Sequence, residues 1–178
     1  PKASTKGSVT VTDLSSDLAK IDPTTTEKLS GALSKAKVNH PTVVETVGNG
    51  TAGFNNGPWY EATFTEPKGL AEDFHARGLV VSCTKGNQIR HIALNGAVTP
   101  LAGSLTGEPG FDNFAGTKAR FNWPQGVSVA PGDGTIAVAD SKNNVVRELA
   151  RPSFVVRTVA GSGVAGFLNA ATPLEARF

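Results

Sequence analysis

The sequence predicts an all-β fold built from repeated small sheets. Three observations support this prediction: a 57-residue internal repeat, short apolar segments separated by turn-forming residues, and a composition with 20 Gly and 11 Pro in 178 residues. With 39% hydrophobic and 18% charged residues, the chain has enough apolar material for the core of one modest domain. We therefore expect an ordered domain rather than a disordered tail.

The internal repeat occupies the chain after residue 42. Residues of several types recur at steps of 57 positions: Phe54 and Phe111; Phe64, Phe121 and Phe178; Pro67 and Pro124; Gly69 and Gly126; Asn87 and Asn144; Arg90 and Arg147. Chance would not hold one register across so many residue types. A repeat of this length indicates units that stack on one another, because one unit alone cannot bury its apolar faces.

Each repeat contains four predicted strands. In the second unit the apolar segments span residues 126–130, 135–140, 145–150 and 154–160. Turn formers separate these segments, among them Asp133-Gly134, a pair that favours a β-hairpin. Four antiparallel strands per repeat form the blade of a β-propeller.

The predicted propeller segment covers residues 43–178, with blade 1 at about 67–103 and blade 2 at about 124–161. Residues 1–42 differ in kind, because they contain no aromatic residue and hold the whole net charge of +2. Within them, Thr24 and Glu27 have the spacing of a capping box. We therefore expect a polar, partly helical N-terminal arm or linker before the propeller.

Two stretches of the second unit carry the motif of a known family, residues 121–129 (FNWPQGVSV) and 136–147 (IAVADSKNNVVR). The sequence there resembles the NHL repeats of β-propellers, and the resemblance extends over residues 43–178. In the first unit Cys83 stands at the position of Asp140, which alters the turn that an Asp would brace. The resemblance implies a ring of about six blades when complete. It says little about activity, because one fold hosts many functions.

Two blades do not close such a ring. The chain supplies two complete blades and a third connecting segment, which ends at Phe178 where the next inner strand would begin. The remaining blades can come from sequence absent here or from other copies of the chain. We favour absent sequence, since a self-contained two-blade protomer would not need a connecting segment after its last strand. The chain begins with Pro1 and contains no Met, so we expect a processed product or a fragment of a longer protein.

Composition and charge exclude several functional classes. Seventeen basic and fifteen acidic residues make the chain neither a polycation nor an acidic mimic of nucleic acid. The single cysteine, Cys83, cannot form an intramolecular disulfide, and we expect it to be a small core residue. No apolar run approaches the roughly 18 to 20 residues that cross a bilayer. We expect a soluble chain with no membrane span, and the sequence does not indicate its compartment.

We predict no catalytic, metal or cofactor site within these residues. The three histidines, His40, His75 and His91, lack the short spacing of a zinc site. The glycine-rich stretch at 161–166 lacks the helix that must follow a dinucleotide-binding loop. Some propellers related to the NHL family are lyases or hydrolases with metal ligands at the central channel. The first alternative is therefore an enzyme whose active site lies in blades absent here.

A protein-recognition role is the favoured prediction, because aromatic residues lie in or just after the connecting segments. Arg90 and Arg147 occupy equivalent positions five residues after Lys85 and Lys142, which predicts a solvated stripe of basic residues. The candidate partner-binding residues are Trp59, Tyr60, Arg90, Trp123, Lys142 and Arg147. We therefore predict a non-catalytic scaffold that binds a protein partner.

RNA binding is the second alternative, since the resemblance implies it for some NHL propellers with a strongly basic face. Residues 43–178 contain 11 basic and 11 acidic residues. Phosphate binding usually requires a large excess of Lys and Arg, because the release of counterions drives it. The balance of charge therefore disfavours a nucleic-acid partner.

Overall fold

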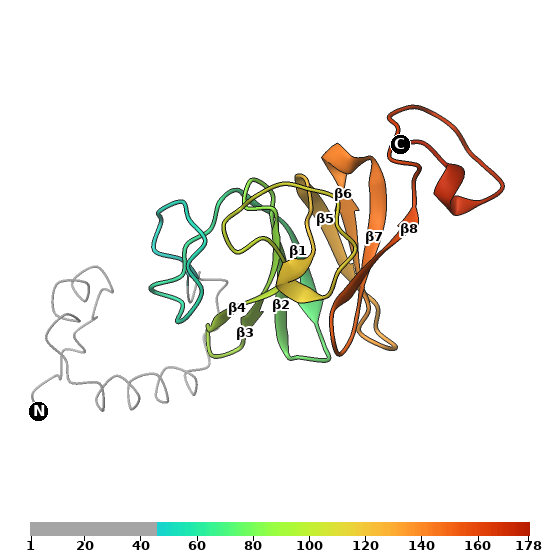
Figure 1. The fold of residues 1–178 in the computed structure, drawn as a ribbon. Coiled ribbons are helices and arrows are strands. Elements are labelled where there is room, and N and C mark those ends of the chain that lie inside the picture. The colour runs from blue at the N-terminus through green and yellow to red at the C-terminus, as the bar shows by residue number, and fades with distance from the viewer. Residues whose placement is uncertain (1–45) are drawn as a thin grey trace, which may run out of the picture. The chain divides into compact units, whose positions relative to one another are not determined.

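The computed structural model describes residues 46–178, which form two four-stranded antiparallel sheets. Blade 1 contains β1 (Pro67–Asp73), β2 (Gly78–Cys83), β3 (Gln88–Ala93) and β4 (Val98–Gly103). Blade 2 contains β5 (Pro124–Val129), β6 (Ile136–Asp140), β7 (Val145–Ala150) and β8 (Val155–Ala160). Strands follow one another in chain order within each sheet, and the two sheets lie side by side (Figure 1). The predicted N-terminal arm lies outside the described residues.

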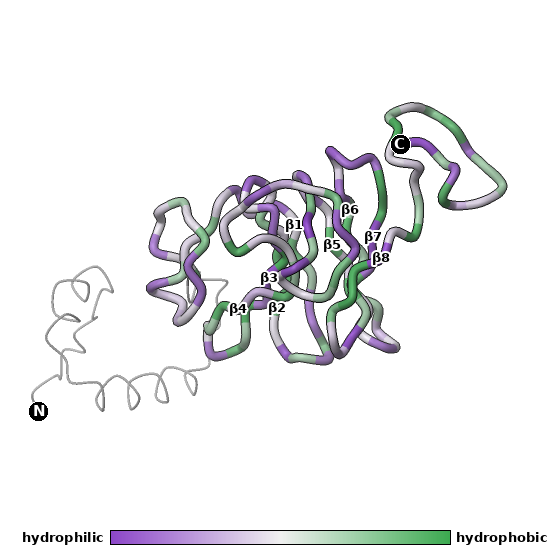
Figure 2. Tube along the Cα trace, in the orientation of Figure 1, coloured by the Kyte–Doolittle hydropathy of each residue, from purple (hydrophilic) through white to green (hydrophobic). Residues whose placement is uncertain are grey.

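The predicted fold class, all-β with propeller blades of four antiparallel strands, is confirmed. Each predicted strand of the second unit begins and ends within two residues of an observed one. The described residues contain no α-helix, only three short 3₁₀ turns: η3 (Gly116–Lys118), η4 (Ser141–Asn143) and η5 (Pro173–Glu175). None of the helices formed by residues 46–178 has the length and apolarity needed to span a membrane. The turn between β6 and β7 is polar (Figure 2), as expected for an exposed hairpin end.

The hydrophobic core lies between the two blades. Its buried side chains come from both sheets and from the segment that joins them: Val80, Ile89, Leu101, Ala102, Ala119, Phe121, Ile136, Val138, Leu149 and Val156. Inner strand β5 packs on β1 and β2. Each sheet therefore uses its neighbour to shield one apolar face from water, which is the physical basis of the repeat.

Polar contacts fix the register between the blades. Thr84 Oγ1 donates to the Pro124 carbonyl at 2.9 Å, and the Trp123 backbone N–H donates to Asn87 Oδ1 at 2.9 Å. Gly69 lies so close to blade 2 that an added Cβ would be 2.1 Å from the Gln125 carbonyl oxygen. Only a residue without a side chain permits this approach.

The far face of blade 2 is uncovered, although the equivalent face of blade 1 is buried. Leu101 of β4 is 8% exposed, whereas Val159, which holds the equivalent place in the ladder of β8, is 37% exposed. Val80 is likewise buried and its counterpart Ala137 is exposed. We call this uncovered surface of β5 to β8 the open face of blade 2.

The matched pair Asn87 and Asn144 tests the contact between the blades. Both residues have a positive φ, +50° and +54°, so replacement by Ala, which tolerates this conformation less well than Asn, adds similar backbone strain at the two positions. Asn87→Ala also leaves the Trp123 N–H without its acceptor. We expect Asn87→Ala to lower the free energy of unfolding by about 1–3 kcal/mol more than Asn144→Ala does. Urea denaturation of the two variants measures the difference, and equal losses would contradict the role assigned to Asn87.

Candidate functional site

The structure separates the predicted contact residues into two groups. The three aromatic residues and Lys142 reach solvent, whereas Arg90 and Arg147 are 0% exposed. The expectation that these two arginines contribute to a solvated basic stripe is therefore wrong. Their guanidinium groups lie inside the protein because carbonyl and amide oxygens replace the water that would otherwise solvate them.

Arg147 joins the connecting segment 104–123 to strand β7. Its Nη1 donates to the Arg120 carbonyl and to Asp140 Oδ2, the latter at 3.0 Å. Its Nη2 donates to the Asp112 carbonyl at 2.6 Å and to Asn113 Oδ1 at 2.8 Å. One side chain thus holds the connecting segment at residues 112–113 and again at residue 120.

Arg90 makes the same contacts one repeat earlier. Its Nη1 donates to the Thr63 carbonyl, and its Nη2 donates to the Asn55 carbonyl and to Asn56 Oδ1. These three partners stand 57 positions before three of the partners of Arg147. An aromatic ring packs on each guanidinium: the centroid of Phe64 lies 4.6 Å from Arg90 Cζ and that of Phe121 4.7 Å from Arg147 Cζ.

The two arginine sites differ in their acidic partner. Asp140 accepts hydrogen bonds from the Asn122 N–H at 2.7 Å and from Asn143 Nδ2 at 2.8 Å, besides its ion pair with Arg147. Burial raises the pKa of Asp140, and these hydrogen bonds oppose the rise. Blade 1 has Cys83 at this position, buried as predicted, and burial raises the pKa of its thiol. Arg90 therefore relies on neutral acceptors instead of a carboxylate.

The two tryptophan positions lie at opposite ends of the blades. Trp123 immediately precedes β5, and Lys142 Nζ lies 3.6 Å from the centroid of its ring. In blade 1 the equivalent pair is Glu66 and Lys85, which form a salt bridge. Lys142 consequently stacks on an aromatic ring where Lys85 has an acidic partner.

Trp59 and Tyr60 form an exposed aromatic pair on the segment before β1. They are 45% and 56% exposed, and their rings meet edge to face with centroids 5.3 Å apart. The β3–β4 turn supports them: Gly96 lies against Trp59, where an added Cβ would be 2.9 Å from the Trp59 Cβ. The same turn carries Leu94, which is 71% exposed.

A surface pocket extends this apolar surface toward the β1–β2 turn. Its lining residues are Glu72, Asp73, Phe74, Arg77, Gly78, Leu79 and Leu94. Phe74 is exposed, although a turn between two strands normally carries polar residues. We call the exposed residues Trp59, Tyr60, Phe74 and Leu94 the blade 1 turn surface. Sequence reasoning missed Phe74 and Leu94, and the available signal was a large apolar residue placed within a turn.

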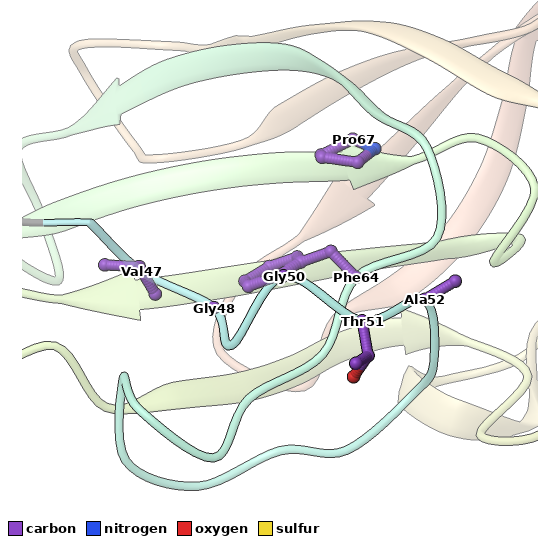
Figure 3. A pocket seen from close by; sticks show the side chains of 7 residues that line it. All are labelled: Val47, Gly48, Gly50, Thr51, Ala52, Phe64 and Pro67. Atoms are coloured by element: carbon purple, nitrogen blue, oxygen red, sulfur yellow. The ribbon is translucent and has the colours of Figure 1, made fainter.

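A second pocket lies along the segment that precedes β1 (Figure 3). Its lining residues are Val47, Gly48, Gly50, Thr51, Ala52, Phe64 and Pro67. None of these residues has a titratable side chain, so the pocket supplies no acid or base. Within residues 46–178, no group of three or more His, Cys, Asp and Glu side chains lies close enough to hold a metal ion.

His91 belongs to a buried polar cluster at the boundary between the blades. Its Nε2 lies 3.8 Å from Asp73 Oδ2 and has no hydrogen-bond partner among the described residues. Arg151 of blade 2 donates to the same Asp73 oxygen. Burial lowers the pKa of His91, the nearby Arg151 lowers it further, and Asp73 opposes both effects. His91 therefore resists protonation in the folded protein.

Comparison with known proteins identifies the repeat. The family model described as NHL repeat matches residues 121–148, which include Phe121, Asp140 and Arg147 of the arginine site. Residues 121–148 are an NHL repeat, and the two blades are a segment of a β-propeller. The NHL match thus coincides with the side chains that hold blade 2 to its connecting segment.

Relatives of this NHL segment include much longer proteins. The protein SUPPRESSOR OF QUENCHING 1, chloroplastic, of Arabidopsis thaliana is 29% identical over 138 residues, which cover 76% of this chain and 13% of the relative. The NHL repeat-containing protein 2 of Bos taurus is 30% identical over 100 residues, which cover 56% of this chain and 13% of the relative. The chain therefore spans about an eighth of the length of these relatives.

A solved structure supports the same fold. A structural genomics protein of unknown function from Bacteroides thetaiotaomicron superimposes with a TM-score of 0.57 at 28% sequence identity. The match covers 63% of this chain and 28% of that protein. The NHL segment thus corresponds to a part of a larger solved protein.

The buried guanidinium of Arg147 gives a direct test of its structural role. Arg147→Ala leaves Asp140 as a buried carboxylate without its ion pair and removes one of the two donors to each of the Asp112 and Arg120 carbonyls. We expect the free energy of unfolding to fall by about 3–5 kcal/mol. The control is Arg157→Ala, because the Arg157 side chain is 64% exposed and we expect a change within about 0.5 kcal/mol. Similar losses in urea denaturation of the two variants would contradict the assignment.

The lowered pKa of His91 predicts a dependence of stability on pH. As the pH falls below about 6.5, the unfolded chain binds a proton at this histidine while the folded chain resists it. The free energy of unfolding should therefore decrease between pH 7.5 and pH 5.0, by roughly 1.4 kcal/mol for each unit by which the pKa is lowered. His91→Asn should lose less stability over the same interval. Urea denaturation across the interval measures both slopes, and parallel slopes would be the contrary result.

Proposed function

We propose that this NHL segment is a non-catalytic module that binds a protein partner through the blade 1 turn surface. The observation that supports the proposal is the pair Trp59 and Tyr60, two large side chains held edge to face and about half exposed. Tryptophan and tyrosine are enriched among the residues that dominate binding energy at protein interfaces. Exposed apolar surface of this kind commonly marks an interaction site.

The backbone around the aromatic pair is held in place before any partner binds. The Gly57 N–H donates to the Val98 carbonyl, and the Val98 N–H donates back to the Gly57 carbonyl. The Trp59 carbonyl accepts the Gly48 N–H at 2.8 Å. A surface that is already ordered loses less conformational entropy on binding, which favours its use as a contact site.

The neighbouring pocket suggests the chemistry of the partner. Phe74 and Leu94 supply apolar walls, while Glu72, Asp73 and Arg77 supply two acidic groups and one basic group at the same pocket. This arrangement suits an apolar anchor side chain flanked by polar groups. The burial of Arg90 and Arg147 removes two cations from the surface, which weakens the RNA-binding alternative.

The experiment compares partner capture by the full-length protein and by surface variants. We expect Trp59→Ala combined with Tyr60→Ala to weaken binding of the captured protein at least about 30-fold, the effect of losing a hot spot of 2 kcal/mol or more. Phe167→Ala is the control, because Phe167 is fully exposed but lies outside the blade 1 turn surface.

Quantitative affinity capture followed by binding titration provides the measurement. Equal affinity of the double variant and the Phe167→Ala control would rule out the blade 1 turn surface as the contact. Capture of RNA that is lost as salt is raised from about 50 mM to 200 mM would support the nucleic-acid alternative instead.

A further inference from the structure

The third connecting segment, residues 161–178, repeats the backbone that receives a buried arginine in each blade. We propose that it forms a guanidinium-receiving site from the Leu168 and Arg177 carbonyls and the Phe178 ring. The occupant is an arginine on the third strand of a further four-stranded repeat, which packs on the open face of blade 2. This inference does not depend on the proposed protein-binding function.

The filled site around Arg147 defines what the receiving backbone looks like. Asp112 and Arg120 pair with each other, through N–H to carbonyl contacts of 3.4 and 3.3 Å, and both carbonyls also accept from Arg147. The Gly110 N–H donates to the Phe121 carbonyl at 2.9 Å, which places the Phe121 ring under the guanidinium. Phe121 is 0% exposed in this arrangement.

The third segment has the same backbone pairing without the arginine. Leu168 and Arg177 pair through contacts of 3.5 and 3.0 Å, and the Gly166 N–H donates to the Phe178 carbonyl at 3.1 Å. The 3₁₀ turn η5 lies 57 positions after η3. Within residues 46–178, no arginine side chain donates to the Leu168 or Arg177 carbonyl, and Phe178 is 55% exposed.

The open face of blade 2 corresponds, position by position, to the face of blade 1 that blade 2 covers. Ser82 of blade 1 is buried and its hydroxyl donates to the Gln125 carbonyl of blade 2, whereas its counterpart Ala139 is exposed. An added Cβ at Gly69 would collide with blade 2, whereas one at Gly126 would meet only the Ala139 Cβ at 3.8 Å. The open face therefore has room for another inner strand.

The occupant is a repeat whose arginine has no preceding connecting segment of its own to bind. A second copy of this chain does not meet this requirement. Blade 1 of a second copy could offer only Arg90 at the equivalent position. Arg90 already donates to Asn55, Asn56 and Thr63 within its own chain. Blade 2 shows the required arrangement, because Arg147 takes its acceptors from the segment that immediately precedes its blade.

The chain itself supplies a repeat for the test. A second copy of residues 122–178, appended directly after Phe178, keeps the 57-residue register and offers its own counterpart of Arg147. We expect the Gly166 and Arg177 amide hydrogens to exchange at least about tenfold more slowly in the extended chain, because the appended repeat would cover the exposed Phe178 beside them.

Two variants of the extended chain isolate the arginine. Arg147→Ala in the appended copy alone should abolish most of the gain in protection, whereas Arg157→Ala in the appended copy should leave it intact. An extended chain whose third segment exchanges at the rate of the parent chain would overturn the proposal, and so would an appended repeat that stays unfolded. Native mass spectrometry of the parent chain covers the remaining case, because a stable oligomer with slow exchange at Gly166 and Arg177 would assign the open face to a second copy.

Discussion

A buried arginine on the third strand of each blade is the constraint on which the rest of the structure depends. A guanidinium cannot lose its water without equivalent acceptors, and in this protein the acceptors are carbonyl oxygens of the preceding connecting segment. The folded position of β3 therefore fixes the position of residues 55–63, and that of β7 fixes residues 112–120. Because the guanidinium would lack acceptors in the interior without these carbonyls, each blade and its preceding segment stabilise one another.

This constraint links the core to the proposed contact surface. Arg90 holds Asn55, Asn56 and Thr63, which flank the turn that carries Trp59 and Tyr60. Arg90 was predicted to touch a partner itself, whereas the structure buries it. It is buried beneath the turn and sets the direction from which the aromatic pair meets solvent. A residue that never contacts the partner can in this way determine the geometry of binding.

The fold was predictable because its signals are local and periodic. Strand segments, the Asp133-Gly134 hairpin and the 57-residue step can all be found within one repeat, and each recurs. The burial of Arg90 was not predictable, because its acceptors are two backbone carbonyls and one neutral amide side chain that lie 27 to 35 residues away. Charge normally predicts exposure. The recurrence of arginine at equivalent positions was the available sign that both arginines have a structural role in the repeated unit.

Departures from the repeat are more informative about function than the repeat itself. The positions of Trp59 and Tyr60 are occupied by Gly116 and Thr117 one unit later, so the fold does not require aromatic residues there. The position of Leu94 is occupied by Arg151, which instead binds Asp73 across the blade boundary. Stability thus depends on what the units share, and the blade 1 turn surface is built from what they do not share. Since that surface is anchored by Arg90 within blade 1, covering the open face of blade 2 would complete the sheet packing without changing the aromatic pair.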